Sequence, residues 1–229
     1  SNIKIYGGEI SENEAGYYNT NGLVFEGGGI FNNVNVNFEM YDGKITKNVS
    51  GDLGGGIAFY NKTCTGTIYG GKITENVSSS GCGILSSSAN LTLKGGLITN
   101  NKKFDQGAGY GYGIYFSGEI NLYAGVQIYG NRSSFSEQNL MIRNGSEILD
   151  RLNIKENLMN NGKTTYIGIS PAVSYAETII TTNYSETNTE PPSKFFFSDN
   201  GYGIHLKDNE ACINKSEKPT FTTINWKWG

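Results

Sequence analysis

The sequence predicts an all-β fold, a right-handed parallel β-helix solenoid that ends in a C-terminal β-cap. Three observations lead to this prediction: a phrase such as IYGGKITEN recurs along the chain, a second phrase, GGGI or a close variant, is interleaved with it, and apolar and polar residues alternate between the two. Alternation with a period of two is typical of strands that bury every second side chain, whereas a helix would repeat at its own, longer period. Many Gly, Asn, Ser and Thr residues among the apolar ones indicate short strands joined by tight turns.

The first phrase places an Ile and, three residues later, an Asn at five positions along the chain. The Ile residues are Ile10, Ile45, Ile73, Ile98 and Ile128, and the Asn residues are Asn13, Asn48, Asn76, Asn101 and Asn131. Successive Ile residues are 35, 28, 25 and 30 positions apart. A repeat of this length that tolerates insertions is typical of a solenoid, in which the insertions lie in loops.

A column of apolar residues before each phrase predicts the core. The column consists of Met40, Ile68, Leu93 and Leu122, and the residue before each of them is polar. We predict about three short strands in each coil, with equivalent residues stacked roughly 4.8 Å apart along the axis. The right-handed sense follows because parallel crossover connections are nearly always right-handed.

The repeated spacing also predicts a role for each residue type in the phrase. The Ile lies in the core, the Gly pair allows a corner with positive φ or a close approach of the backbone, and the Asn turns the next corner because Asn tolerates the left-handed conformation. Stacked Asn side chains can also hydrogen-bond to one another along the axis. N-glycosylation is the alternative for Asn48, Asn76 and Asn131, which begin Asn-x-Ser sequons. The structural column is favoured because it accounts for all five Asn residues.

The composition narrows the classes of function. The formal net charge is −3 and charged residues make up 17 %, so a broad basic surface for nucleic acid is not expected. No apolar run approaches the roughly 18–20 residues that a membrane-spanning helix needs. The 3 cysteines match no zinc framework and are expected to be buried free thiols. We expect no cofactor and no metal.

The organisation of the chain is predicted in two continuous parts. Residues 1–131 form the regular coils of the β-helix, and residues 132–229 form the last coils and the β-cap. Within the second part, Asp208 and Asn209 are expected at a hairpin turn, and Thr182–Ser193 is expected to be an exposed loop. The chain enters in mid-coil, so we expect it to be a module with neighbouring domains in a longer protein.

The two phrases together resemble a known group of proteins. GGGI alternating with GGxIxxN is similar to the β-helix repeats of adhesin-like bacterial cell-surface proteins in the pectate-lyase-like superfamily. The likeness is closest to modules of gut Firmicutes, in which the helix is followed by segments like Gln138–Ile154 and Lys194–Ile213. This resemblance implies a secreted or cell-surface location. It also implies a module that binds a glycan or a host surface, or that acts as an extended spacer.

The main alternative is a polysaccharide lyase or a glycoside hydrolase of the same superfamily. Such enzymes use clustered carboxylates, or calcium bound by Asp together with an Arg base. The 6 Asp residues of this chain are scattered, and His205 is the only imidazole. We therefore expect no catalysis.

The candidate ligand-binding residues are tyrosines. Next to the core column lie outward positions that are aromatic in four copies out of five, namely Tyr6, Tyr41, Tyr69 and Tyr123, with Lys94 as the exception. They form either a stacking ladder that stiffens the sheet or an aromatic platform for sugar rings, and the ladder is favoured. A second candidate is the GYGYGIYF segment, which contains Tyr110, Tyr112 and Tyr115 and adjoins a long insertion.

Overall fold

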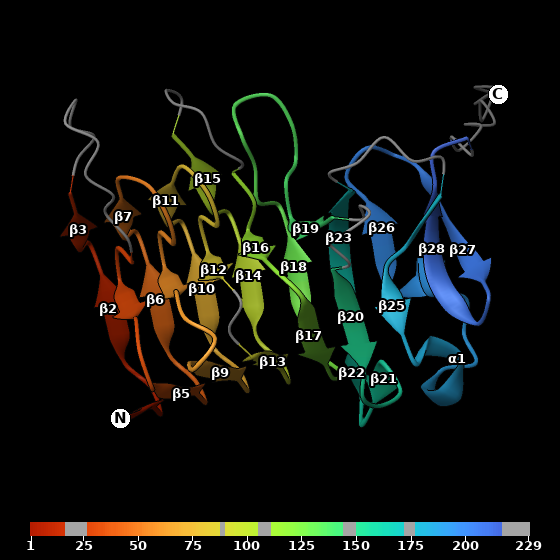
Figure 1. The fold of residues 1–229 in the computed structure, drawn as a ribbon, viewed down its shortest axis with the longest axis horizontal. Coiled ribbons are helices and arrows are strands. Elements are labelled where there is room, and N and C mark those ends of the chain that lie inside the picture. The colour runs from red at the N-terminus through yellow and green to blue at the C-terminus, as the bar shows by residue number, and fades with distance from the viewer. Residues whose placement is uncertain (17–26, 88–89, 105–110, 144–149, 172–176, 217–229) are drawn as a thin grey trace, which may run out of the picture.

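The structure is a computed structural model, and it describes residues 1–16, 27–87, 90–104, 111–143, 150–171 and 177–216. The chain winds into a parallel β-solenoid of about 5 turns whose axis runs from the N-terminal coil to a small C-terminal sheet (Figure 1). This confirms the predicted all-β, parallel β-helix fold.

Each regular turn contributes four short strands rather than the three that we predicted, and equivalent strands stack into four parallel ladders. The first ladder is β1 (Asn2–Ile5), β5 (Asn37–Met40), β9 (Thr65–Ile68), β13 (Asn90–Leu93), β17 (Glu119–Leu122), β20 (Arg151–Ile154) and β25 (Thr181–Thr182). The second is β2 (Glu9–Ser11), β6 (Lys44–Thr46), β10 (Lys72–Thr74), β14 (Leu97–Thr99) and β18 (Gln127–Tyr129). The third is β3 (Glu14–Ala15), β7 (Val49–Ser50), β11 (Val77–Ser78) and β15 (Lys102–Lys103). The fourth is β4 (Ile30–Asn32), β8 (Ile57–Phe59), β12 (Ile84–Ser86), β16 (Ile114–Phe116) and β19 (Leu140–Ile142).

The ladders keep the register that the repeat predicts. Met40 is aligned with Ile68, and Ile68 with Leu93, in the first ladder. The phrase Ile residues are aligned in the second ladder, where Ile45 pairs with Ile73. These side chains fill the interior of the solenoid and are at most 1 % exposed. In β9 a core position is occupied by Gly66, which has no side chain. The ring of Phe59, from β8, fills the space there.

The Asn column forms a continuous chain of side-chain hydrogen bonds, which we call the amide ladder. In each step the Nδ2 of one Asn donates to the Oδ1 of the next, over distances of 2.8–3.0 Å. Its members are Asn13, Asn48, Asn76, Asn101, Asn131 and a sixth residue, Asn139, which lies outside the repeated phrase. The same Oδ1 atoms also accept the backbone N–H of the preceding Asn, as from Asn48 to Asn76 at 3.0 Å. The predicted stacking of these side chains is therefore confirmed.

A carboxylate ends the amide ladder. Asp199 accepts hydrogen bonds from the Nδ2 of Asn139 at 2.6 Å, from the backbone N–H of Asn139 at 2.8 Å and from the hydroxyl of Ser170. The amide dipoles all point the same way, so the negative charge of Asp199 lies at their positive end. Burial raises the pKa of Asp199 above its ordinary value, and the bonds from Ser170 and Asn139 oppose this shift.

The interleaved GGGI phrase makes room for the amide ladder. The third position of the phrase is Gly in each copy, and a Cβ added there would lie 3.0 Å from Asn76 at Gly56, 2.9 Å from Asn101 at Gly83 and 2.5 Å from Asn131 at Gly113. Any side chain there would displace the amide that stacks beside it. The two phrases alternate because the glycine backbone before each strand of the fourth ladder packs directly against an Asn side chain of the amide ladder.

The sharp corner lies one residue earlier than predicted. The residue before each of the five Asn residues of the repeated phrase, rather than the Asn itself, has a positive φ between 56° and 65°. These residues are Glu12, Lys47, Glu75, Asn100 and Gly130. The prediction assigned the left-handed conformation to Asn because Asn tolerates it, but the Asn side chain is held by the ladder instead. The predicted positive φ is found at the second glycine of the pair, for example 83° at Gly71, whereas the first, Gly70, closely approaches the backbone of Tyr41.

The C-terminal part continues the solenoid and closes it. The long strand β23 (Tyr166–Pro171) pairs with β18, β19 and β26 (Phe196–Ser198), and so joins the second and fourth ladders. A separate antiparallel sheet follows, β24 (Glu177–Ile179), β28 (Glu210–Asn214) and β27 (Gly203–Lys207), and β21 (Met159–Asn160) pairs with β22 (Lys163–Thr164). The hairpin turn predicted at Asp208 and Asn209 joins β27 to β28, and both residues have positive φ, 50° and 65°.

The prediction of an exposed loop at Thr182–Ser193 is wrong. This segment contains α1 (Tyr184–Thr187) and the start of a 3-10 turn (Pro192–Lys194), and it packs against the core. Tyr184 is only 1 % exposed, and its hydroxyl donates to the carbonyl of Glu190 at 2.7 Å. The polar composition of the segment gave no sign of its three buried residues, which are Tyr184, Asn188 and Pro192.

Candidate functional site

Tyr6, Tyr41, Tyr69 and Tyr123 lie on one outer face, as predicted, each directly after a strand of the first ladder. We call these four residues the tyrosine row. Their rings stack along the axis, with centroids 4.9 Å apart for Tyr6 and Tyr41 and 4.6 Å apart for Tyr41 and Tyr69. The planes are nearly parallel, at 9° and 2°. Lys94 continues the row, with its ammonium 5.3 Å from the ring centre of Tyr69 and 4.7 Å from that of Tyr123.

This stacking limits what the tyrosine row can offer to a ligand. Sugar rings pack on exposed aromatic faces, but here each inner face is covered by the next ring or by Lys94. The hydroxyl of Tyr41 also donates to Glu39 at 3.0 Å, and Glu39 in turn pairs with Lys4. The row therefore presents mainly ring edges to solvent, and Tyr6 at its N-terminal end is 69 % exposed.

We expect Tyr69→Ala to lower the free energy of unfolding by about 1 kcal/mol, because it removes one stacked pair and one cation–π contact. Urea denaturation followed by circular dichroism measures this loss. Thr67→Ala, on the same outer face of β9, is the matched control and should cost less. If Tyr69→Ala leaves stability unchanged and abolishes glycan binding, the row is a binding platform instead.

The second predicted cluster is only partly within the described residues. Tyr110 lies outside them. Tyr112 is 6 % exposed, and its ring centre lies 6.3 Å from that of Tyr115. Most of the Tyr112 ring is thus covered by protein, which leaves little of it to contact a ligand.

A groove on the second ladder is a more open candidate that the sequence analysis missed. It has a volume of about 690 Å³ and runs along the outer face of β6, β10 and β14. Its floor is a row of aligned threonines, of which Thr74 is half-buried and Thr46 and Thr99 are only 6 % and 8 % exposed, and Tyr129 continues the same row. The outward Lys and Thr of each KIT triplet could have indicated it, because they flank an inward Ile and so must line one face.

The two walls of the groove carry charges of both signs. One wall is the aligned row of Glu9, Lys44, Lys72 and Leu97, and the other consists of the left-handed corner residues Lys47, Glu75, Asn100 and Gly130. Hydroxyl, amide, ammonium and carboxylate groups thus alternate along a channel parallel to the axis. Such a lining can hydrogen-bond to a linear polymer with many hydroxyl groups.

An aromatic cluster adjoins the C-terminal end of the groove. The ring centre of Tyr129 lies 6.2 Å from that of Tyr166, which stacks on Phe197 at 4.6 Å. Tyr129 is 37 % exposed and Tyr166 is 45 % exposed. The rings of Tyr129 and Tyr166 are tilted by 60° relative to each other, whereas neighbouring rings of the tyrosine row are nearly parallel.

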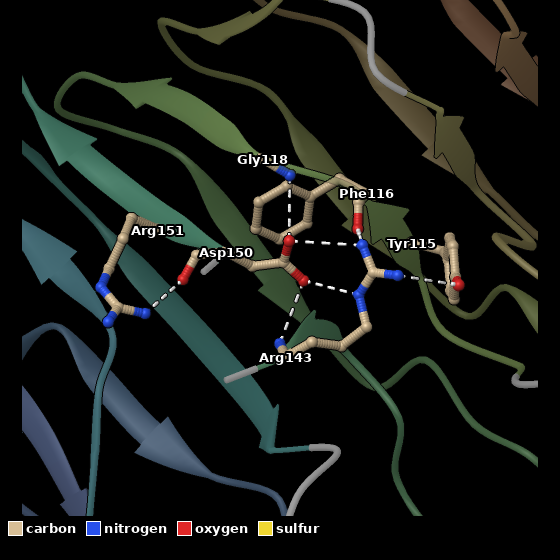
Figure 2. A network of polar contacts seen from close by, with 6 residues as sticks. All are labelled: Tyr115, Phe116, Gly118, Arg143, Asp150 and Arg151. Atoms are coloured by element: carbon tan, nitrogen blue, oxygen red, sulfur yellow. Dashed lines mark hydrogen bonds and ion pairs between the residues drawn. The ribbon is translucent and has the colours of Figure 1, made fainter. Parts of the chain in front are cut away.

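The most buried charged group among the described residues is an ion pair between Arg143 and Asp150 (Figure 2). The guanidinium donates to both carboxylate oxygens, at 2.8 Å and 3.3 Å, and to the carbonyl of Phe116 at 2.8 Å. The carboxylate also accepts the backbone N–H groups of Gly118 and Arg143. The guanidinium lies 5.2 Å from the ring centre of Tyr115.

This pair is arranged for structure rather than for proton transfer. Burial lowers the pKa of Arg143, but the hydrogen bond and charge of Asp150 raise it by more, so the net pKa lies above its ordinary value. A guanidinium held in this way cannot act as a base. Asp150 is 0 % exposed, and its oxygens are occupied by protein donors, so it cannot reach a substrate.

Other chemical groups in the described part of the chain give no further candidate. The cysteines are buried free thiols, as predicted, and burial raises the pKa of Cys82 to about 11, which disfavours the nucleophilic thiolate. The described residues hold no group of three or more His, Cys, Asp or Glu side chains that could bind a metal. Asn48, Asn76 and Asn131 are 0 % exposed, so the sequon interpretation fails for the folded protein. Among the described residues, no helix is long and apolar enough to cross a membrane.

Comparisons of this chain with models of protein families, with curated proteins and with solved structures gave no match.

Proposed function

We propose that this chain is a non-catalytic module of a bacterial cell-surface protein, and that it binds a linear glycan in the groove of the second ladder. The groove is the observation that supports this proposal, because hydroxyl and charged groups repeat along it and an aromatic cluster adjoins one end. The resemblance of the two repeated phrases to adhesin-like surface proteins supports the location. The rigid solenoid would also separate neighbouring domains of a longer parent protein.

The arrangement of acidic residues supports binding rather than cleavage. The groove contains two carboxylates, Glu9 and Glu75, on opposite walls and two turns apart. Two turns correspond to roughly 10 Å along the axis alone. The carboxyl groups of retaining glycosidases lie about 5–5.5 Å apart and those of inverting enzymes about 6.5–9.5 Å apart.

A glycan array probed with the full chain tests the proposal, followed by calorimetric titration of the oligosaccharides that bind. We expect Tyr129→Ala to weaken binding by about tenfold or more, which corresponds to ~1.4 kcal/mol. Thr74→Val should weaken it severalfold, since it removes one hydroxyl from the floor at nearly constant volume. Thr67→Val, the same change on the first ladder, is the matched control and should leave affinity unchanged.

Two results would contradict the proposal. One is equal loss of affinity in Thr74→Val and Thr67→Val, because the groove would then have no special role. The other is the release of new reducing ends or unsaturated products from a polysaccharide, with turnover that disappears in Glu9→Gln or Glu75→Gln. That second result would establish the lyase or hydrolase alternative.

A further inference from the structure

A compact hairpin presents one aromatic side chain to solvent. It links β18 to β19 and rises above the upper edge of the solenoid in Figure 1. Phe135 at its tip is 97 % exposed, the highest value among the exposed large apolar residues of the described chain. The hairpin is closed by backbone bonds from Gln138 to Asn131 at 2.7 Å and from Ser133 to Ser136 at 3.0 Å. The exposure of Phe135 is therefore imposed by an ordered turn.

A basic hollow lies beside this hairpin. It has a volume of about 610 Å³, within the range of small-ligand sites, and its lining includes Lys102, Lys103, Arg132 and Phe135. Lys102 and Arg132 are neighbours through a parallel bridge between consecutive turns. Neither of these two side chains is in an ion pair within the described residues. Two adjacent cations therefore face solvent on a chain whose net charge is −3.

The remaining lining adds hydrogen-bonding groups. Ser133 and Ser136 line it with hydroxyls whose oxygens lie 3.5 Å apart, and Glu137 contributes one acceptor next to Arg132. Single exposed apolar residues are common on proteins and by themselves indicate nothing. Here a fixed aromatic face, two adjacent cations and several hydroxyls surround the same hollow, which matches a sugar ring that carries an anionic substituent.

We propose that the hollow formed by Lys102, Arg132 and Phe135 binds a sugar bearing a sulfate or carboxylate group. The ring of Phe135 packs against the sugar, Lys102 and Arg132 pair with the anionic group, and Glu137 accepts from a sugar hydroxyl. An anionic membrane surface fits less well, because the carboxylate of Glu137 in the same lining would repel it. This site lies outside the groove of the second ladder, so it does not depend on the function proposed above.

The test uses the full chain and three oligosaccharides of equal length, one sulfated, one uronic-acid-containing and one neutral. Binding is followed by calorimetry at low and high salt, together with sedimentation of vesicles that contain anionic lipid. We expect an anionic oligosaccharide to bind, and its affinity to fall on the order of tenfold between 50 mM and 500 mM salt because the charges are exposed. The neutral oligosaccharide should bind this site at least tenfold more weakly.

Variants locate the site. The double variant Lys102→Gln/Arg132→Gln should weaken anionic binding by more than tenfold, and Phe135→Ser should weaken it severalfold. Lys62→Gln/Lys155→Gln removes the same charge elsewhere on the surface and is the matched control, with an unchanged melting temperature as the folding check for every variant. The proposal is overturned if no anionic oligosaccharide binds, if only vesicles bind, or if the control weakens binding as much as the site variant. A failure here leaves binding of a neutral glycan to Tyr129 and Thr74 untouched, so the two proposals are tested separately.

Discussion

Replacing Asn76 by Ala is expected to lower the free energy of unfolding by about 3–5 kcal/mol, because several buried groups lose a partner at once. The Oδ1 of Asn76 accepts from both the backbone N–H and the Nδ2 of Asn48, each at 3.0 Å. Its Nδ2 donates to the carbonyl of Ile45 at 2.9 Å and to Asn101 at 2.9 Å. All these groups lie in the interior, where an unpaired donor or acceptor costs about 1–3 kcal/mol.

Urea denaturation of purified Asn76→Ala and wild-type protein measures the loss. Asn33→Ala is the matched control, because Asn33 is exposed and lies outside both phrases, and its change should be within ~0.5 kcal/mol. A loss below about 1 kcal/mol for Asn76→Ala would show that the amide ladder contributes little to stability.

The second large effect is expected from Arg143→Met, which should cost about 3–5 kcal/mol. This change leaves the carboxylate of Asp150 in a fully buried position without its cation, and breaking a buried pair in this way is strongly destabilising. It also removes the donor to the carbonyl of Phe116. The substitution should loosen three segments at once, because the ion pair connects β16, the end of β19 and the start of β20.

A double-mutant cycle of Arg143→Met, Asp150→Leu and the double variant separates the pair from simple loss of packing. Arg143→Met/Asp150→Leu removes both charges and leaves no uncompensated buried charge, so it should be less destabilised than Arg143→Met alone. Arg132→Met serves as the exposed control and should be nearly neutral. Equal stability of the single and double variants in thermal and urea unfolding would refute the assignment of Asp150 as a charge that Arg143 must compensate.

Much of the fold could be predicted because the repeated residues are those that stack on their equivalents inside the solenoid. Ile45 and Asn76 recur at fixed spacing since each occupies a position that stacks on its equivalent in the next turn. Any residue that must bond to its own copy is recognisable from one sequence. The hairpin at Asp208 and Asn209 was predictable for a related reason, because few residues adopt two successive positive φ values.

Features that depend on contacts between different columns could not be predicted in this way. Asn139 extends the amide ladder only 8 residues after Asn131, without the surrounding phrase, so no spacing indicates it. Tyr184 is buried because α1 packs against β20 and β28, and no local pattern in the sequence indicates this contact. The groove was missed because the tyrosine row is more regular in sequence, although its rings cover one another in space.

The amide ladder also bears on how such a molecule can change length. Each internal amide makes the same bonds to the amide before it and the amide after it, so a copied coil inserted between two others finds its partners already in place. The carboxylate of Asp199 receives only the last amide, so an insertion preserves this closure when it enters on the N-terminal side. The molecule can therefore lengthen by whole coils through in-frame duplication, while every new amide stays bonded and the C-terminal closure is inherited unchanged.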